Sequence, residues 1–554
     1  MRPINVSLLF SLLVVMTVGL PVESAAQAPP AVSEMLEVRL MNVDFIVTDP
    51  SGAIVAGLEG GDFELLEEGK AQKISNFSEF PSGSTAGQSG KRIILYFDRT
   101  NLSTANRDAA IEASRELLKK HLGPNDRAMI ATWSGKLETP LTWSGEIAAT
   151  DAALAALAKQ PALSPARLSE QRALEASMDE LTRDDPLFNV AVGPASAGAG
   201  VEMVMASVRR YAASVRGDVL QQLDALQKTL LSASDTDGRK VLLLFSESMP
   251  ARPGADMLQR TDGVREKIQG RGSPGGRNLA ISEAANYDLG EAFGALARSA
   301  NAAGVMIYAV NPRTAGTGQR GSGNVERVEH TEGNVEFALD SQASDGLQIL
   351  ARETGGRVFA GVSPATASGM IDAELGSWYS LGYRAAPAGP AVRRLEIKPR
   401  DPKHVVRARS QVFYRSIVDE MSERVVAHQL MSPTLNELGI RLDIQDPQTV
   451  HEGKKVQPVR ILVPADRLTL VASGAQVTGG FSVFVCSGDG KGKNSGVNMQ
   501  THPIQWPKEV LAHTAGRDVT YIVQVPVDSK MPQVSVGVID HVSQQRGFAR
   551  TSLK

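Results

Sequence analysis

The chain has 554 residues, of which 42% are hydrophobic, and its formal net charge at pH 7 is -3. This length exceeds what one hydrophobic core supports, so several domains are expected. The nearly neutral charge excludes a chain-wide attraction to nucleic acid or to an anionic membrane surface, and we expect no nucleic-acid partner.

The amino terminus has the pattern of a secretion signal. Arg2 precedes an apolar run over residues 8–20, and the small residues 24–26 offer a cleavage site. We therefore expect residues 1–26 to be removed and the mature protein to be secreted or periplasmic; an uncleaved anchor is the alternative. No later run reaches the roughly 18 to 20 apolar residues of a membrane-spanning helix, so no membrane span is expected after signal removal.

Residues 35–82 alternate short β-rich runs with turn sequences such as the one over residues 49–52. This pattern predicts a small β-rich amino-terminal unit. Its acidic residues lack the regular spacing of a calcium loop, so solvated turn edges are expected there.

From residue 91 the pattern changes to alternating strands and helices. Residues 93–97 form a continuous apolar run, which is typical of a strand covered on both faces, and helical spacing begins after Ser103. The alternation predicts a doubly wound, mostly parallel α/β domain over residues 90–385, followed by two closing strands in residues 386–415. Further strands of this sheet are expected at residues 128–133, 241–245, 305–310, 358–360 and 378–383.

Three stretches interrupt this alternation. Residues 146–216 are Ala-rich and predict a helical insertion with a flexible break at residues 189–200. Residues 251–277 and 312–333 are Gly-rich, cationic loops that follow two strands, so they should emerge at the same edge of the sheet as Asp98. Such loops either hold an acidic partner or are disordered.

The carboxyl-terminal part is predicted to be all β. No helical pattern follows residue 419, and short alternating strands such as residues 440–444 predict a β-sandwich-like domain over residues 425–554. The only cysteine, Cys486, lies in one of these apolar runs. It excludes an intrachain disulfide and is expected to be a buried, unreactive thiol.

Two carboxylates follow strands of the predicted parallel sheet. Asp98 ends the strand at residues 93–97, and Glu247 comes just after the strand at residues 241–245. Ligands of open α/β sheets bind where strand carboxyl ends and helix amino ends meet. We therefore expect both carboxylates at one edge of the sheet, near each other.

These segments resemble a known family. Their order along the chain is similar to that of the von Willebrand factor type A-related secreted proteins common in acidobacteria, from about residue 38 to residue 414. The carboxyl-terminal part lies outside the resemblance. The segments that carry it are KRIILYFDRTNLS, GRKVLLLFSES, GVMIYAVN, LQILARETGGRVF and SWYSLGYR.

The resemblance implies a metal-ion-dependent adhesion site. Such a site holds Mg²⁺ or another divalent cation with an Asp-x-Ser-x-Ser loop, a Thr before a later helix and an Asp after the fourth strand. Carried over, Asp98 matches the first ligand and Thr100 the first Ser, while Ser103 lies one residue beyond the second Ser. The Thr position falls near Asp218, and the last Asp corresponds to Glu247.

The sequence departs from this motif in ways that affect the metal. Leu102 occupies the second Ser position and cannot coordinate, and Glu247 is longer than the usual Asp. Mg²⁺ requires near-ideal octahedral geometry, so the alternative is a domain that keeps the shape without the metal. In that case Asp98 is expected to cap the following turn or to pair with Arg99 or Arg127.

No catalytic constellation emerges from the sequence. There is no G-x-S-x-G elbow and no H-E-x-x-H helix, and the eight histidines have no ligand spacing. We therefore expect no enzyme, but an exported adhesion or binding protein that uses the sheet edge around Asp98 to engage a protein or cell-envelope partner. The alternatives are a metal-free structural scaffold and a hydrolase with an unrecognised site.

Overall fold

The structure is a computed structural model that divides into two compact units. The first is Val38–Leu230 with Asp237–Tyr414, and the second is Leu231–Thr236 with Arg415–Lys554. The predicted signal at residues 1–26 and most of the predicted loop at 312–333 lie outside the described residues. The structure describes residues 39–81, 90–161, 164–182, 194–233, 238–269, 279–313, 344–385, 391–414, 416–430, 436–449, 455–490, 493–514 and 516–553.

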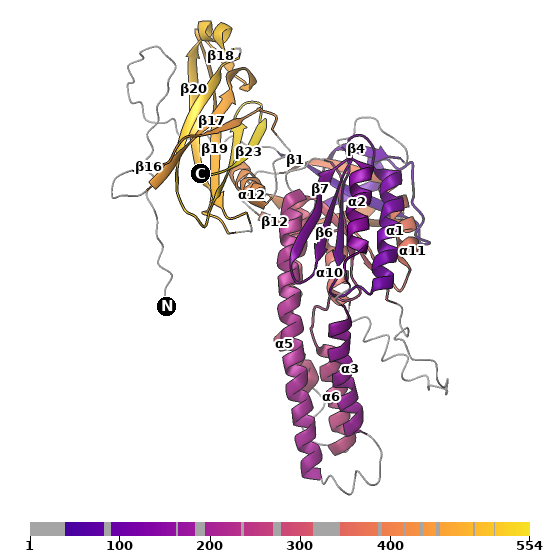
Figure 1. The fold of residues 1–554 in the computed structure, drawn as a ribbon. Coiled ribbons are helices and arrows are strands. Elements are labelled where there is room, and N and C mark those ends of the chain that lie inside the picture. Colours follow the sequence, from indigo (N-terminus) through magenta and orange to yellow (C-terminus); the bar gives the residue numbers. More distant parts are fainter. Residues whose placement is uncertain are drawn as a thin grey trace. The chain divides into compact units, whose positions relative to one another are not determined.

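A six-stranded sheet forms the centre of the first unit (Figure 1). Its order is β10-β9-β8-β5-β6-β7, and all neighbours pair in parallel except the edge strand β7. After β5 the chain adds β6 and β7 on one side of it, and then β8, β9 and β10 on the other side. The strand order therefore reverses between β5 and β8. The strands are β5 (Arg92–Asp98), β6 (Arg127–Trp133), β7 (Leu137–Ser144), β8 (Lys240–Phe245), β9 (Val305–Asn311) and β10 (Val358–Ala360).

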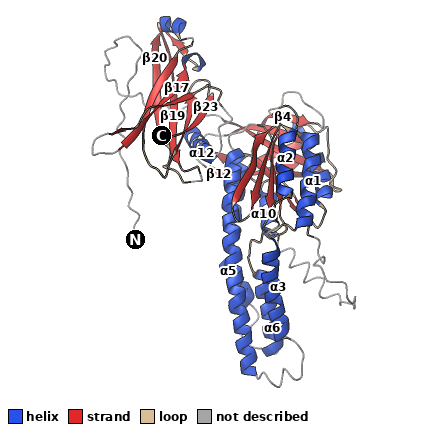
Figure 2. Cartoon of the chain, viewed as in Figure 1, coloured by secondary structure: helices blue, strands red, loops and turns tan. Residues whose placement is uncertain are grey.

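Helices cover both faces of this sheet (Figure 2). On one face Ile93, Leu95 and Phe97 of β5 share a buried core with α1, α2 and α11. On the other face α8 and α10 contact β9 and each other. The doubly wound arrangement follows from strands that are apolar on both sides. These helices are α1 (Thr104–His121), α2 (Ile147–Ala158), α8 (Gly290–Ala303), α10 (Asp345–Glu353) and α11 (Pro364–Gly376).

Two four-stranded antiparallel sheets join the amino-terminal segment to the closing strands. One has the order β13-β1-β11-β4 and the other β14-β12-β2-β3. The prediction that residues 378–383 belong to the parallel sheet is wrong, because β11 pairs antiparallel with β1 and buries Tyr379 against Phe45. The strands are β1 (Arg39–Thr48), β2 (Phe63–Glu67), β3 (Lys70–Gln72), β4 (Ile74–Phe80), β11 (Trp378–Ala385), β12 (Ala391–Pro399), β13 (Val405–Ala408) and β14 (Gln411–Tyr414).

Three long helices run alongside one another away from the parallel sheet (Figure 1). They are α3 (Ser164–Leu181), α5 (Pro194–Ala233) and α6 (Ala255–Gln269), with the short α7 (Leu279–Ala284) beside α6. Two predictions here are corrected. Residues 194–200 of the predicted break belong to α5, and much of the predicted loop at 251–277 is α6, whose buried face includes Met257, Leu258 and Val264.

The second unit contains two antiparallel sheets around one core. Its helix α12 (Ile417–Leu430) corrects the expectation of no helix, since Met421 and Val425, one turn apart, pack on Phe484 and Cys486. Cys486 is buried as predicted, and burial raises the pKa of its thiol to about 11. The strands are β15 (Arg441–Ile444), β16 (Gln448–Thr449), β17 (Lys455–Pro464), β18 (Val471–Ser473), β19 (Gln476–Gly488), β20 (Asn498–Pro507), β21 (Asp518–Pro526), β22 (Gln533–Asp540) and β23 (Arg546–Ser552).

Candidate functional site

The carboxylate of Asp98 lies at the end of β5, where the strand order reverses, and it is fully buried. Its Oδ1 accepts hydrogen bonds from Thr100 N at 3.1 Å, Thr100 Oγ1 at 2.6 Å and Asn101 N at 3.2 Å. Its Oδ2 accepts from Asn101 Nδ2 and Ser246 Oγ, both at 2.7 Å. Five protein donors therefore surround one carboxylate.

Ser246 ties this carboxylate to the neighbouring strands. Its backbone N donates to Val310 O of β9 at 3.1 Å, and its hydroxyl reaches Asp98 of β5. One residue before each of these two side chains, the rings of Phe97 and Phe245 stack with centroids 5.0 Å apart. The polar cluster thus rests on a packed aromatic pair, which fixes the separation of β5 and β8 at this edge.

Glu247 reaches from the end of β8 to the start of α1. Its Oε1 accepts hydrogen bonds from Ser103 N at 2.7 Å and Asn106 Nδ2 at 3.0 Å. Ser103 is the N-cap of α1, and a carboxylate at a helix amino terminus is favoured by the helix dipole. Glu247 is half-exposed, unlike the fully buried Asp98.

The structure brings four of the five predicted site residues together in one polar network. The network consists of the hydrogen-bonded groups around Asp98 and around Glu247, which adjoin because Ser246 and Glu247 are consecutive residues. The fifth residue has another partner. Asp218 lies on α5, where its carboxylate forms an ion pair with Arg167 of α3. It is joined to the network by no contact among the described residues. The four that come together are Asp98, Thr100, Ser103 and Glu247.

Three residues of the network were missed by the sequence analysis: Asn101, Asn106 and Ser246. Each had a sequence signal. Asn101 stands three residues after Asp98 in a strand-to-helix loop, Asn106 lies three residues after the N-cap, and Ser246 directly follows a buried strand. Short polar side chains at such positions commonly bond to loops and helix ends.

As arranged, these residues do not fit a divalent cation. Both Asp98 oxygens already accept hydrogen bonds from protein donors, and Asn101 presents its amide N–H rather than its carbonyl to Oδ2. Leu102 is buried in the apolar core. In the described part of the chain no three His, Cys, Asp or Glu side chains gather closely enough to hold a metal ion.

The turn-capping alternative for Asp98 agrees with the hydrogen bonds, whereas the arginine alternatives do not. Asp98 Oδ1 accepts from the backbone N–H groups of the next turn. The Arg99 guanidinium instead donates to Pro161 O at 3.0 Å, and Arg127 donates to the carbonyl of Pro124 at 2.9 Å. Burial lowers the pKa of Arg99, although Glu138 nearby opposes this effect.

Comparisons with known proteins leave the family open. No family model and no curated protein matches the chain. Among solved structures, an aerotolerance-related membrane protein from Bacteroides fragilis is 12% identical, with 52% of this chain and 98% of that chain covered and a TM-score of 0.20. The conserved hypothetical protein BatB from Bacteroides thetaiotaomicron is 12% identical, with 52% and 97% covered and a TM-score of 0.22.

A pilus adhesin, SpaC from Lactobacillus rhamnosus GG, is 8% identical, with 92% of this chain and 57% of that chain covered and a TM-score of 0.20. Scores at this level show no family. The fold is therefore defined by the strand order and pairing of the sheets alone. None of the helices in the described ranges is long and apolar enough to cross a membrane.

Proposed function

We propose that this chain is an exported, non-catalytic binding protein with an adhesion role at the cell envelope. It engages a protein or cell-envelope partner with the edge of the parallel sheet formed by residues 98–106 and 246–248, which we call the switch-point edge. Open α/β sheets bind ligands where the strand order reverses, and β5 and β8 end there. Export rests on the signal pattern in residues 1–26.

The observation that supports this proposal is that two neighbouring carboxylates differ in burial and in hydrogen bonding. Asp98 is buried and accepts hydrogen bonds from the loop after β5 and from the loop after β8, so it fixes the shape of the edge. Glu247 is half-exposed, and only its Oε1 is hydrogen-bonded to described residues. The Glu247 side chain therefore offers a partner one carboxylate oxygen, which suits a Lys, Arg or N–H donor on that partner.

Binding rather than catalysis fits the chemistry of the edge. Ser246 Oγ lies 2.7 Å from the Asp98 carboxylate but has no exposed surface. The half-exposed Thr100 Oγ1 lies 2.6 Å from the same carboxylate, but four other donors already occupy that carboxylate, which makes it a poor base. A nucleophile needs both an adjacent base and access to substrate. The alternative of a metal-free structural scaffold predicts that no partner contacts this edge more than any other surface.

Photo-crosslinking from the two ends of α1 tests the proposal. A photoreactive residue at Thr104, which is exposed within the edge, is compared with one at Lys119, which is 51% exposed at the other end of the same helix. In an envelope extract of the producing cells we expect a discrete adduct from Thr104 and not from Lys119. Glu247→Gln should reduce the Thr104 adduct several-fold, because it removes the charge but keeps an acceptor.

Equal labelling from Thr104 and Lys119 would favour the scaffold alternative. A discrete Thr104 adduct that Glu247→Gln leaves unchanged would keep the edge as the binding surface but remove Glu247 from recognition.

A further inference from the structure

Strand β21 (Asp518–Pro526) forms one edge of a sheet in the second unit. It pairs antiparallel with β17 along its whole length, and with no other strand in the described part of the chain. An edge of this kind exposes a row of backbone N–H and C=O groups to which another strand can bond. The residues whose backbone groups point outward therefore decide what this edge can bind.

The hydrogen bonds of β17 show which residues of β21 point outward. In an antiparallel pair, opposite residues alternately bond to each other and point away from each other. Pro458 of β17 has no N–H and its O accepts from Gln445 N at 3.0 Å, so the opposite residue Gln524 points away from β17. Three residues further on, Val527 N bonds to Lys455 O at 3.0 Å, as the alternation requires. The outward residues of β21 are Asp518, Thr520, Ile522 and Gln524.

The other long edge strand of this unit, β20, is protected by prolines, whereas β21 is not. Gly480 of β19 lies opposite Pro503, and its O accepts from His541 N at 3.0 Å. Pro503 therefore points outward from β20, and so does Pro507 four residues later. An outward proline offers no N–H and hinders the addition of a further strand. None of the outward residues of β21 is a proline, and Asp518 is the only charged one.

Packing holds β21 in place with its outer edge open. Tyr521, Val523 and Val525 alternate with the outward residues and are buried in the core between the two sheets. The outward residues are half-exposed, and their backbone groups have no partner among the described residues. A strand that binds here therefore meets an edge that is already formed.

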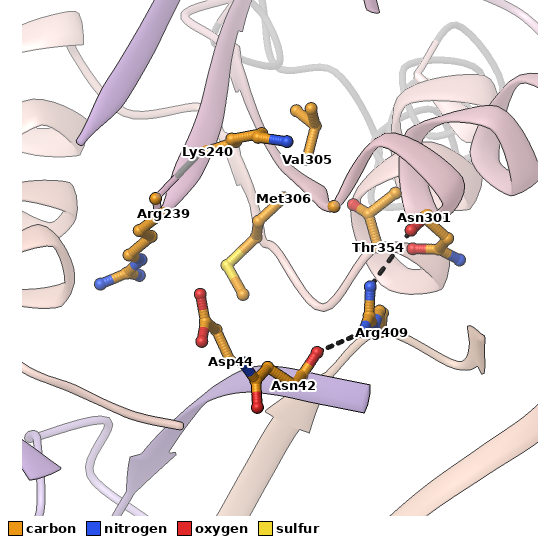
Figure 3. Close-up of a pocket in the computed structure, with 11 residues that line it drawn as sticks. Asn42, Asp44, Arg239, Lys240, Asn301, Val305, Met306, Thr354 and Arg409 are labelled. Atoms are coloured by element: carbon orange, nitrogen blue, oxygen red, sulfur yellow. Dashed lines mark hydrogen bonds between the residues drawn. The ribbon is translucent and has the colours of Figure 1, made fainter. Parts of the chain in front are cut away.

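The pocket of the first unit shows the opposite situation (Figure 3). It has a volume of about 170 Å³ and lies beside the first residues of β8 and β9. Arg409 donates to Asn301 O at 3.2 Å and to Asn42 O, and Lys240 Nζ donates to Ala303 O at 3.0 Å. These two cations already bond to backbone carbonyls, whereas the outward backbone groups of β21 do not.

The edge of β21 is complementary to itself. When two β21 strands run antiparallel about a twofold axis at Tyr521, Thr520 lies opposite Ile522 of the second copy, and Asp518 lies opposite Gln524 of the second copy. This is the register in which all four outward residues face one another, so every outward N–H meets a C=O. The charge of Asp518 faces a neutral amide and not its own copy.

We propose that two copies of this chain associate through their β21 strands, in the register centred on Tyr521. The partner is a second copy of the chain, and the two sheets continue into each other across the pair of strands. The interface belongs to the second unit and is independent of the switch-point edge. A pair of chains carries two switch-point edges, so two weak contacts with one surface can act together.

Sedimentation equilibrium of the parent protein tests this pairing. We expect a mass that rises with concentration to twice that of one chain. Ile522→Pro should raise the dissociation constant at least tenfold, because it removes an outward N–H without removing a bond to β17. Met499→Pro is the matched control, since Met499 is an outward residue of β20, and it should leave the dissociation constant within about twofold of the parent.

Mixed cysteine variants test the register without a proline. Opposite residues of a hydrogen-bonded pair have Cα atoms about 5.5 Å apart, which a disulfide spans. Oxidation of a mixture of Thr520→Cys and Ile522→Cys proteins should give a covalent dimer, whereas neither variant should crosslink when oxidised alone. The natural Cys486 is buried.

Three results would overturn the proposal. The mass of a single chain at every concentration would leave β21 open to a strand of another protein. A dimer that both prolines weaken equally, or that neither weakens, would place the interface elsewhere. Covalent dimers from Thr520→Cys alone, with none from the mixture, would exclude the register centred on Tyr521.

Discussion

The Asp98 carboxylate is the best-satisfied charged group of the switch-point edge. Its five donors come from three residues on two loops, and no part of it reaches solvent. A buried charge is tolerated only when it is hydrogen-bonded in this way. In the proposed function Asp98 therefore has an indirect role, since it fixes the two loops that hold Glu247.

Asp98→Ala should lower the free energy of unfolding of the first unit by about 2–4 kcal/mol, because Thr100, Asn101 and Ser246 lose their shared acceptor in a buried site. Urea unfolding measures the change. Glu64→Gln, at an exposed carboxylate, is the control and should stay within about 0.5 kcal/mol of the parent. An Asp98→Ala effect as small as that of the control would contradict the account.

The sequence predicted where the two carboxylates lie but not how they are held. Asp98 and Glu247 follow apolar strands, so a parallel sheet places them at one edge. The hydrogen bond from Ser103 N to Glu247 joins residues 144 positions apart, and which loop side chain turns toward which carboxylate depends on packing that periodicity does not encode. Asn101, Asn106 and Ser246 were missed for this reason.

At the scale of elements, continuous apolar runs predicted the strands well and mixed patterns did not. Residues 93–97 and 241–245 lie in central strands as expected. The helix α6 was missed because its apolar positions are diluted by Gly and Arg, and α12 because it is a single amphipathic helix in a strand-rich region. Strand β11 was assigned to the wrong sheet, since a single sequence shows a strand's polarity but not its partner.

Gly254 shows how a single residue sets the path from β8 into α6. Its φ is +75°, and a Cβ built there would lie 2.5 Å from the Ala212 Cβ of α5. Gly254→Ala should lower the midpoint of urea unfolding by an amount equivalent to at least about 1 kcal/mol. Gly263→Ala is the control, because Gly263 lies within α6 with open space around it, and it should stabilise the protein slightly. Equal effects of the two substitutions would contradict this placement.

Strand β20 of the second unit should be sensitive to acid. His502 lies between the rings of Phe481 and Tyr521, and burial, aided by the nearby His541, lowers the pKa of His502. Burial also lowers the pKa of His541, although Asp540 opposes this. Because the folded pKa is below the ordinary value of 6.5, the unfolded state binds more protons at low pH.

Stability contributed by the neutral rings is therefore present above about pH 6.5 and lost as the pH falls below it. We expect hydrogen exchange in β19 and β20, corrected for intrinsic rates, to accelerate between pH 7.5 and 5.5. His502→Phe should reduce that acceleration. Protection that is constant over this range, or that rises toward pH 5.5, would contradict the direction given for the pKa.

At the scale of the whole molecule, the proposed binding surface, the switch-point edge, belongs to the first unit. The second unit has its own core. Length and pattern predicted a chain of several domains. They did not predict that strands near residue 40 pair with strands near residue 380, because such pairings close only in the folded chain.

The central claim is that protein donors, rather than a cation, hold the carboxylate at the end of β5. Calorimetric titration of the parent protein and of Asp98→Ala with Mg²⁺, Mn²⁺ and Ca²⁺ tests it most directly. We expect only heats of dilution from both proteins, since the oxygens of Asp98 are already taken by Thr100, Asn101 and Ser246. Saturable binding in the parent that disappears in Asp98→Ala would contradict the claim and restore a metal-dependent adhesion site.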